Sequence, residues 1–175
     1  MSREGSATVE TVIGELEKTY GGFPIGEERT TVPRNQFVEC VEMAGQNRLG
    51  GARALLTSKD RVLLARYREN PDVWEMPGGS LDSHETHEQA ARRHVADQLG
   101  VECEVTAVFS ARRHTFSLVD DGDGADGLWV CFEAEPVTDE LEPAADLVEV
   151  EWFEEPPAAV ETAVRDRLVV DPGRS

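Results

Sequence analysis

The chain has 175 residues, of which 39% are apolar and 30% charged, so it has enough apolar material for one folded domain and general disorder is excluded. Its 35 Asp and Glu against 17 Lys and Arg give a formal net charge of −18. Such a surface repels nucleic-acid phosphates and anionic membranes, since both are bound through clustered positive charge. We therefore expect neither a nucleic-acid polymer nor a membrane among its partners.

The three cysteines indicate the compartment. Cys40, Cys103 and Cys131 are odd in number and form no CxxC pair, which argues against a disulfide framework or a zinc knuckle. No apolar run reaches the length of a membrane span, and the residues after Met1 lack the apolar stretch of a secretory signal. We expect a cytoplasmic protein.

The kinds and positions of the charges are also informative. Lys18 and Lys59 are the only lysines, and few lysines with an excess of acids are typical of proteins from salt-loving organisms. Molar salt shortens the Debye length to about 3 Å, so self-repulsion is screened there. An ordinary acidic protein is the alternative. Residues 118–175 hold 17 acids and 3 arginines, so an anionic substrate is expected to bind in the earlier part of the chain.

Two helices are expected before residue 49. Apolar residues recur at the 3.6-residue period over 8–20, until Gly21 and Gly22 end the pattern. A polar loop is expected up to Thr31, and Pro33 then fits the first turn of a second helix that ends near Gly45. We interpret residues 1–48 as an N-terminal helical extension that packs on the main domain. A dimerisation arm, and hence a homodimer, or a substrate lid is the alternative.

From Leu49 the pattern changes to strands around one long helix. Strands are expected at 52–57, 61–67, 101–109, 112–119, 128–135 and 148–153, with a short one entering a glycine turn at 74–79. Helices are expected at 86–99 and 157–169, and loops at 68–72 and 120–127. Because strands occur both in hairpins and around helices, we expect residues 49–175 to form an α/β domain with a mixed sheet and helices on both faces.

One stretch carries a family resemblance. GGSLDSHETHEQAARRHVADQLGV starts at Gly78, and it resembles the Nudix box, in which glycines, glutamates and an Arg-Glu pair stand at fixed spacing. The matching residues are Gly79, Glu85, Arg93, Val95, Gly100 and Val101, with Trp74, Pro77 and Gly78 as a similar lead-in. The resemblance to Nudix (MutT-like) hydrolases covers residues from about 49 to 165. It implies a Nudix-like α/β/α sandwich.

The resemblance also implies an activity: cleavage of the diphosphate linkage in a small nucleoside diphosphate-linked compound, such as ADP-ribose, NADH or a nucleoside triphosphate, with Mg²⁺ or Mn²⁺. Positions 94, 97 and 98 share one helix face, and three carboxylates there would bind a divalent metal that neutralises the diphosphate and activates water. In the family, Glu85 and Arg93 look like a salt bridge that pins the loop to the helix.

The sequence departs from the box where that chemistry is located. His94, Asp97 and Gln98 stand where the family has glutamates, so Mg²⁺ should bind weakly, while a His-Asp pair suits a softer ion such as Mn²⁺, Zn²⁺ or Ni²⁺. With Glu85, Arg93, His94 and Asp97 as catalytic candidates, we expect weak or metal-shifted hydrolysis. The alternatives are a catalytically inactive nucleotide-binding or regulatory module, in which the box only packs, and other chemistry on this fold.

Metal ligands and substrate contacts complete the expected site. The candidate metal ligands are Gly78, His94, Asp97, Gln98 and Asp146. Asp146 lies shortly before Trp152, where the family often supplies a further acid, and an ordinary surface acid is the alternative reading. The candidate contacts for a diphosphate are Arg66, Arg68, Arg112 and Arg113, since a planar guanidinium fits phosphate oxygens. Pairing of these arginines with the surplus acids is the alternative.

Overall fold

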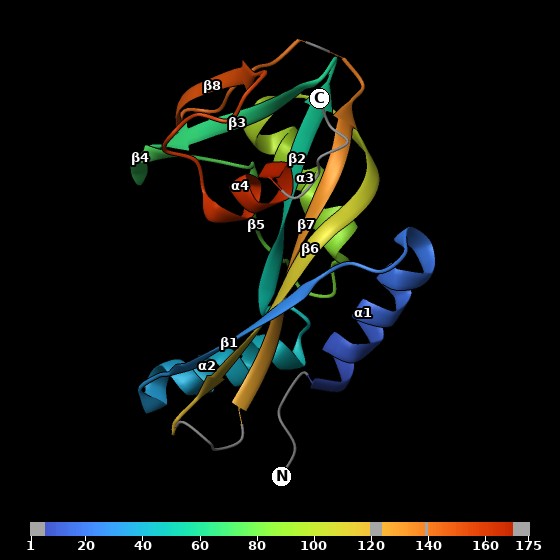
Figure 1. The fold of residues 1–175 in the computed structure, drawn as a ribbon. Helices are drawn as coiled ribbons and strands as arrows, with labels where there is room; N and C mark the ends of the chain where they lie inside the picture. Colours follow the sequence, from blue (N-terminus) through green and yellow to red (C-terminus); the bar gives the residue numbers. More distant parts are fainter. Residues whose placement is uncertain (1–5, 120–123, 139, 170–175) are drawn as a thin grey trace.

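The structure is a computed structural model that describes residues 6–119, 124–138 and 140–169 (Figure 1). In chain order its elements are α1 (Ser6–Tyr20), β1 (Ile25–Thr31), α2 (Arg34–Gly45), β2 (Gly50–Ser58), β3 (Arg61–Tyr67), β4 (Asn70–Glu75), β5 (Gly78–Ser80), α3 (His87–Leu99), β6 (Cys103–Ser117), β7 (Gly124–Pro136), β8 (Leu147–Phe153) and α4 (Thr162–Val169). Among the helices in these ranges, none has the length and apolar character that crossing a membrane requires.

All the strands belong to one mixed sheet. The strand order is β1-β6-β7-β2-β3-β4, with β5 paired to β2 and β8 paired to β3. β1 runs parallel to β6 and β2 runs parallel to β7, whereas the other pairs are antiparallel. This confirms the mixed sheet expected from hairpins interspersed with helices.

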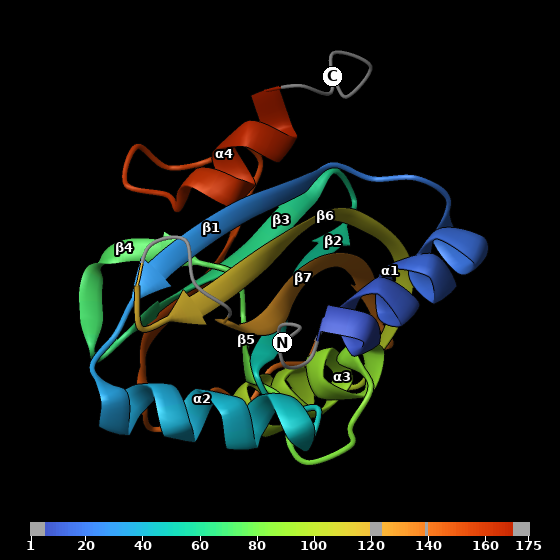
Figure 2. The ribbon, with the colours of Figure 1, turned by 90° about the horizontal axis from the view of Figure 1, so that it is seen from below.

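Helices cover both faces of the sheet. Along β2, Ala52, Ala54 and Leu56 pack in the core that α1 and α3 share, while Leu55 packs in the core beneath α4. Alternate residues of a strand point to opposite faces, so β2 is apolar on both. Figure 2 shows α4 on one side of the sheet and α1, α2 and α3 on the other. The α/β/α sandwich is therefore confirmed.

The expected loop between the two N-terminal helices is wrong, because Ile25–Thr31 forms the edge strand β1. It pairs with β6, with Ile25 opposite Ala111 and Thr31 opposite Ser117. Six of its seven residues are exposed, so backbone hydrogen bonds rather than buried side chains hold it in place. Such a strand leaves no apolar alternation in the sequence. Residues 1–48 are thus not wholly helical where described, since β1 extends the main sheet.

Other strands are longer in the structure than expected, because their pairing continues beyond the segments in which the sequence pattern indicates a strand. β4 takes up part of the expected loop at 68–72. The two strands expected at 101–109 and 112–119 are one long strand, β6, whose register on β7 shifts twice. β7 begins at Gly124, within the expected acidic loop at 120–127, of which 120–123 lie outside the described residues. Antiparallel pairing of β6 with β7 explains both extensions.

The last helix is shorter than the sequence indicated. Helix α4 begins at Thr162 instead of residue 157, since the preceding segment pairs with β4. The Trp74 N–H donates to the Ala159 carbonyl at 2.7 Å, and the Glu161 N–H donates to the Trp74 carbonyl at 2.9 Å. Backbone groups committed to these bonds cannot also continue a helix. The pairing also brings Glu161 beside the end of β4.

Candidate functional site

The box helix α3 forms where the sequence predicts it, with defined caps at both ends. At its start the Thr86 hydroxyl accepts from the Gln89 N–H at 3.1 Å, and the Gln89 side chain accepts from the Thr86 N–H at 3.0 Å. Gly100 ends the helix in the left-handed conformation at φ 67°. Ala91 and Val95 are fully buried. These residues fix the rotation of the helix, in which His94 and Gln98 are half-buried and Asp97 is exposed.

The glycine turn before this helix has no room for side chains. Gly78 has φ +156°, and a Cβ there would lie 2.3 Å from the Ala52 carbonyl oxygen. A Cβ on Gly79 would lie 2.6 Å from Cε1 of His94. The β2–β5 pairing sets Arg53 opposite Gly78. The turn is therefore held between β2 and α3, with its backbone close to both.

Glu85 and Arg93 form the expected salt bridge. Arg93 Nε donates to Glu85 Oε2 at 2.8 Å and Arg93 Nη2 donates to Oε1 at 2.9 Å, while Nη2 also donates to the Ser80 carbonyl at 3.1 Å. The Asp82 N–H donates to Glu85 as well. The hydrogen bonds from Arg93 are the main cause that lowers the pKa of Glu85, against the opposing effect of burial. This pair fixes the loop on the helix.

His94 is bound to the same loop. Its Nε2 lies 2.8 Å from the carbonyl oxygen of Ser80. A carbonyl oxygen only accepts hydrogen bonds, so this contact requires a proton on Nε2. A protonated ring nitrogen has no lone pair for a metal, so Nε2 is not a ligand in this arrangement. His94, which we expected to bind a metal, instead contacts the Ser80 carbonyl through Nε2.

Gln98 links three elements. Its Nε2 donates to the Gly78 carbonyl at 3.0 Å, and its Oε1 accepts from the Tyr67 hydroxyl at 2.6 Å. The two partners determine the orientation of the amide, because a carbonyl needs a donor and the hydroxyl here needs an acceptor. Burial is the main cause that raises the pKa of Tyr67, so its hydroxyl keeps its proton. The Gly78 carbonyl, another expected ligand, is therefore bound to an amide.

The remaining carboxylates lie apart from these contacts. The Asp97 side chain is 68% exposed, and its nearest cation is Arg93, with 4.0 Å between Nη1 and Oδ2. Asp146 is exposed, and its backbone carbonyl accepts from the Arg68 N–H at 3.0 Å. Its charge contributes to raising the pKa of Tyr67, so Asp146 lies within electrostatic range of that hydroxyl. Neither carboxylate joins His94 or Gln98 in a ligand cluster.

The arrangement does not fit a tightly held divalent cation. Across the described ranges no three His, Cys, Asp or Glu side chains gather at metal-binding distance. The oxygens of Gly78 and Ser80 accept hydrogen bonds from the side chains of Gln98 and His94, respectively. Mg²⁺ and Mn²⁺ prefer several charged oxygens, and Asp97 is the one carboxylate at positions 94, 97 and 98. The donor set expected for Mg²⁺ or Mn²⁺ is not assembled.

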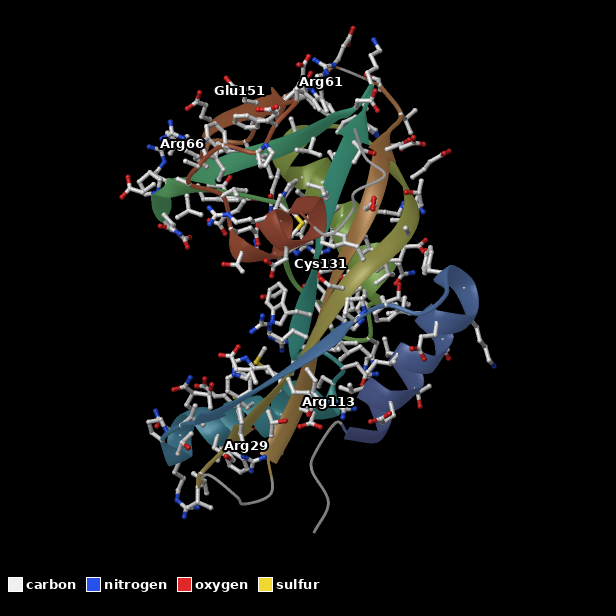
Figure 3. The ribbon with its side chains drawn as sticks, viewed as in Figure 1. Arg29, Arg61, Arg66, Arg113, Cys131 and Glu151 are labelled. Atoms are coloured by element: carbon white, nitrogen blue, oxygen red, sulfur yellow. The ribbon has the colours of Figure 1, made fainter. Side chains whose placement is uncertain are left out.

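The four arginines expected to bind a diphosphate are not brought together. Arg66 pairs with Glu149, and Arg68 donates to the Ala145 carbonyl. Arg112 pairs with Glu28 at 2.8 Å, and Arg113 pairs with Glu10. Figure 3 shows Arg66 near β4 and Arg113 near α1, at opposite ends of the molecule. Arg66, Arg112 and Arg113 thus pair with acidic side chains, which is the alternative given for them above.

A different arginine lies beside the glycine turn. Arg53 Nη1 is 3.4 Å from Glu75 Oε1 and 3.8 Å from Glu161 Oε2, and its guanidinium lies over the Trp129 ring at 5.5 Å. Glu161 accepts from the Met76 N–H at 2.6 Å, and burial is the main cause that raises its pKa. No pattern in the sequence predicted this cluster. Its members are separated by 22 to 108 residues: Arg53 lies on β2, Glu75 on β4 and Trp129 on β7, and the backbone bonds to Trp74 place Glu161 beside them.

Comparisons with known proteins agree with this architecture. The sequence model of the NUDIX domain matches residues 48–169. An RNA pyrophosphohydrolase of Rhodospirillum rubrum is 35% identical over 46 residues, which cover 26% of this chain and 28% of that protein. The match thus spans about a quarter of either protein.

Two solved structures share the fold. A NUDIX hydrolase from Nitrosomonas europaea superposes with a TM-score of 0.55 at 19% identity, covering 70% of this chain and 69% of that chain. An ADP-ribose pyrophosphatase from Streptococcus suis gives a TM-score of 0.50 at 17% identity, covering 73% and 92%. The family model spans most of the chain and includes the capped helix and the glycine turn. This chain therefore belongs to the NUDIX domain family.

Proposed function

We propose that this protein binds a small nucleoside diphosphate-linked compound beside the glycine turn, and that its diphosphate hydrolysis is strongly attenuated. One observation carries the proposal: Gln98 and His94, which replace glutamates of the box, donate to the carbonyl oxygens of Gly78 and Ser80. These two bonds satisfy the backbone without a cation. The frame that shapes the turn, the Glu85–Arg93 pair, is kept. The site thus keeps its shape and loses its charged metal ligands.

Arg53 is the residue that we assign to the substrate phosphates. It stands opposite Gly78 in the sheet, and its contacts with Glu75 and Glu161 are long for ion pairs. A planar guanidinium binds two phosphate oxygens at once, and stacking on Trp129 holds its plane. The net charge of −18 disfavours a polyanion, so we expect a small nucleotide rather than an RNA.

The test combines binding with turnover. ADP-ribose, NADH and ATP are titrated calorimetrically in EDTA, and product release is then followed with Mg²⁺ or Mn²⁺, for wild type and for the triple variant His94→Glu, Asp97→Glu, Gln98→Glu. We expect wild type to bind at least one compound in EDTA, and the triple variant to hydrolyse it about 100-fold faster. If the triple variant is no faster, or if wild type binds none of the three, the proposal is wrong.

Arg53 has a matched control within the chain. Arg61 also lies over a tryptophan ring, that of Trp152 at 5.2 Å, but at the far end of β3. Arg53→Met should weaken nucleotide binding by about tenfold, the effect expected for a lost charge-assisted hydrogen bond, and Arg61→Met should leave it unchanged. Equal effects of the two substitutions would contradict the assignment of Arg53.

A second candidate function is hydrolysis with an altered metal preference. The observation that favours it is the exposure of Asp97 one helical turn from His94, next to an intact Glu85–Arg93 pair. This function requires turnover by wild type that is faster with Mn²⁺, Zn²⁺ or Ni²⁺ than with Mg²⁺. His94→Ala and Asp97→Ala should then each lower the rate by about tenfold. No turnover with any of the four ions would exclude it.

A further inference from the structure

A cavity lies between α1 and the first turns of α3. Its volume is about 520 Å³, within the range of small-molecule sites. Glu85 borders it, but His94, Asp97 and Gln98 do not. Figure 2 shows α1, α2 and α3 on the same side of the sheet, and residues of all three helices line the cavity. The cavity is therefore separate from the face on which the box differs from its family.

Most of its interior is apolar. The apolar lining residues are Val9, Val12, Leu16, Ala44, Leu49, Leu81 and Leu128. They come from α1, the end of α2, the segment just before β2, the loop before α3, and β7, so five parts of the chain contribute to one wall. An apolar wall of this kind binds the body of an organic ligand through the hydrophobic effect.

The charges at the cavity favour a cation. Glu15 and Glu88 both line it, and in the described part of the chain Arg92 is its single basic residue apart from histidines. Glu88 accepts a hydrogen bond from the Tyr20 hydroxyl, whose pKa burial and Glu88 raise to about 12. Tyr20 therefore stays neutral and does not offset the carboxylate charge of Glu88, while Arg92, one turn further along α3, is the cation within electrostatic range of this pair.

The other charged groups of the lining already have partners. Glu85 forms its pair with Arg93. Asp126, at the buried end, accepts from the Thr115 hydroxyl at 2.6 Å and lies 3.8 Å from Arg113. The start of α3, whose positive end attracts anions, carries the Thr86–Gln89 capping bonds and the first-turn charge of Glu88. Two carboxylates against one arginine thus determine the sign of the site.

We propose that this cavity binds a small organic cation, in which an ammonium group is carried on an apolar body. The ammonium group interacts with the carboxylates of Glu15 and Glu88, and the body packs among the leucines. A diphosphate compound has the opposite charge, so this ligand is distinct from the one proposed for the glycine turn. The two proposals rest on different residues, and either can fail without the other.

Three probes with one indole body and different charges test the inference: tryptamine (cation), tryptophol (neutral) and indole-3-propionate (anion). Their dissociation constants are measured by calorimetry on the full chain at one ionic strength. We expect tryptamine to bind about tenfold more tightly than tryptophol, and the propionate to bind least. If none of the three binds, or if the propionate binds as tightly as tryptamine, the proposal is overturned.

Two substitutions and one control substitution locate the binding. Glu88→Gln keeps an acceptor for Tyr20 and removes the charge, so it should weaken tryptamine several-fold and leave tryptophol unchanged. Glu42→Gln, an exposed acid of α2 outside the cavity, is the matched control and should change neither. Val12→Trp fills the cavity and should abolish binding of both probes, with the fold checked by circular dichroism. Full binding by a folded Val12→Trp chain would place the probes elsewhere and overturn the inference.

Discussion

The amide of Gln98 donates to the carbonyl oxygen of Gly78 at 3.0 Å, across 20 residues of sequence and between the box helix and the glycine turn. A glutamate at position 98 would direct a carboxylate at that carbonyl, and the two oxygens would repel unless a cation lay between them. The glutamine amide thus makes a contact that a glutamate makes only with a bound ion. The stability of this chain should therefore be independent of divalent metal.

Gln98→Glu should reverse this independence. Without metal, the variant has no donor for the Gly78 carbonyl, and the group that accepts from the Tyr67 hydroxyl is now a charged carboxylate. We therefore expect the unfolding free energy to fall by about 1–3 kcal/mol. Mn²⁺ should restore part of the loss in the variant and leave wild type unchanged. Urea denaturation in EDTA and in Mn²⁺ measures both. Gln36→Glu, on the exposed side of α2, is the control, and an equal loss there would contradict this reading.

The Glu85–Arg93 pair should be the main electrostatic support of the loop. Arg93→Met removes both hydrogen bonds to Glu85 and leaves a mostly buried carboxylate without its cation, so we expect a loss of about 2 kcal/mol. Its exposed neighbour Arg92 makes a good comparison, and Arg92→Met should change stability by no more than about 0.5 kcal/mol. Chemical denaturation at pH 7 gives both values. Similar losses of unfolding free energy in the two variants would contradict the role of the Glu85–Arg93 pair as the main electrostatic support of the loop.

His87 should make stability depend on pH. Burial is the main cause that lowers its pKa below the ordinary value near 6.5, and its Nε2 lies 2.9 Å from the Leu128 carbonyl. The unfolded chain therefore binds a proton at His87 at a higher pH than the folded chain does. The contribution of His87 to the unfolding free energy is fully present above about pH 6.5 and is lost as the pH decreases below it. His87→Gln keeps a donor for Leu128 and should flatten this fall. Unfolding free energies between pH 7 and pH 5 measure it.

The exposed His84 provides the control for that titration, because it is close to His87 in the sequence but lies at the surface. His84→Gln should retain the wild-type fall in stability. The assignment to His87 would be wrong if both variants kept the same pH profile, or if His84→Gln were the one that flattened it.

The net charge of −18 should make the fold more stable in concentrated salt. Repulsion among surface carboxylates decreases as the Debye length shortens from about 10 Å at 0.1 M to about 3 Å at 1 M. We expect the melting temperature to rise steadily with KCl up to molar concentrations. Calorimetric scans in KCl measure this, with sucrose as a non-ionic control for preferential exclusion. A melting temperature that is flat or falls in KCl would contradict the interpretation as a salt-adapted surface.

The sequence by itself determined the box helix and its local contacts. Helix α3 follows from a 3.6-residue apolar period bounded by a Thr86 cap and Gly100, and the Glu85–Arg93 pair joins residues only eight apart. Contacts of this kind depend on local geometry, which residue spacing specifies. The occurrence of strands both in hairpins and around helices likewise predicted a mixed sheet covered on both faces.

Only the tertiary structure determined the contacts around the glycine turn. The bond from Gln98 to Gly78, the hydroxyl of Tyr67 on that same amide, and the position of Arg53 near Glu161 all depend on strand register and on how α3 lies against the sheet. The edge strand β1 was equally hidden, because it is held by backbone hydrogen bonds and buries almost no side chains. Side-chain patterns record burial and local spacing, whereas partners distant in the chain are decided by how the elements pack.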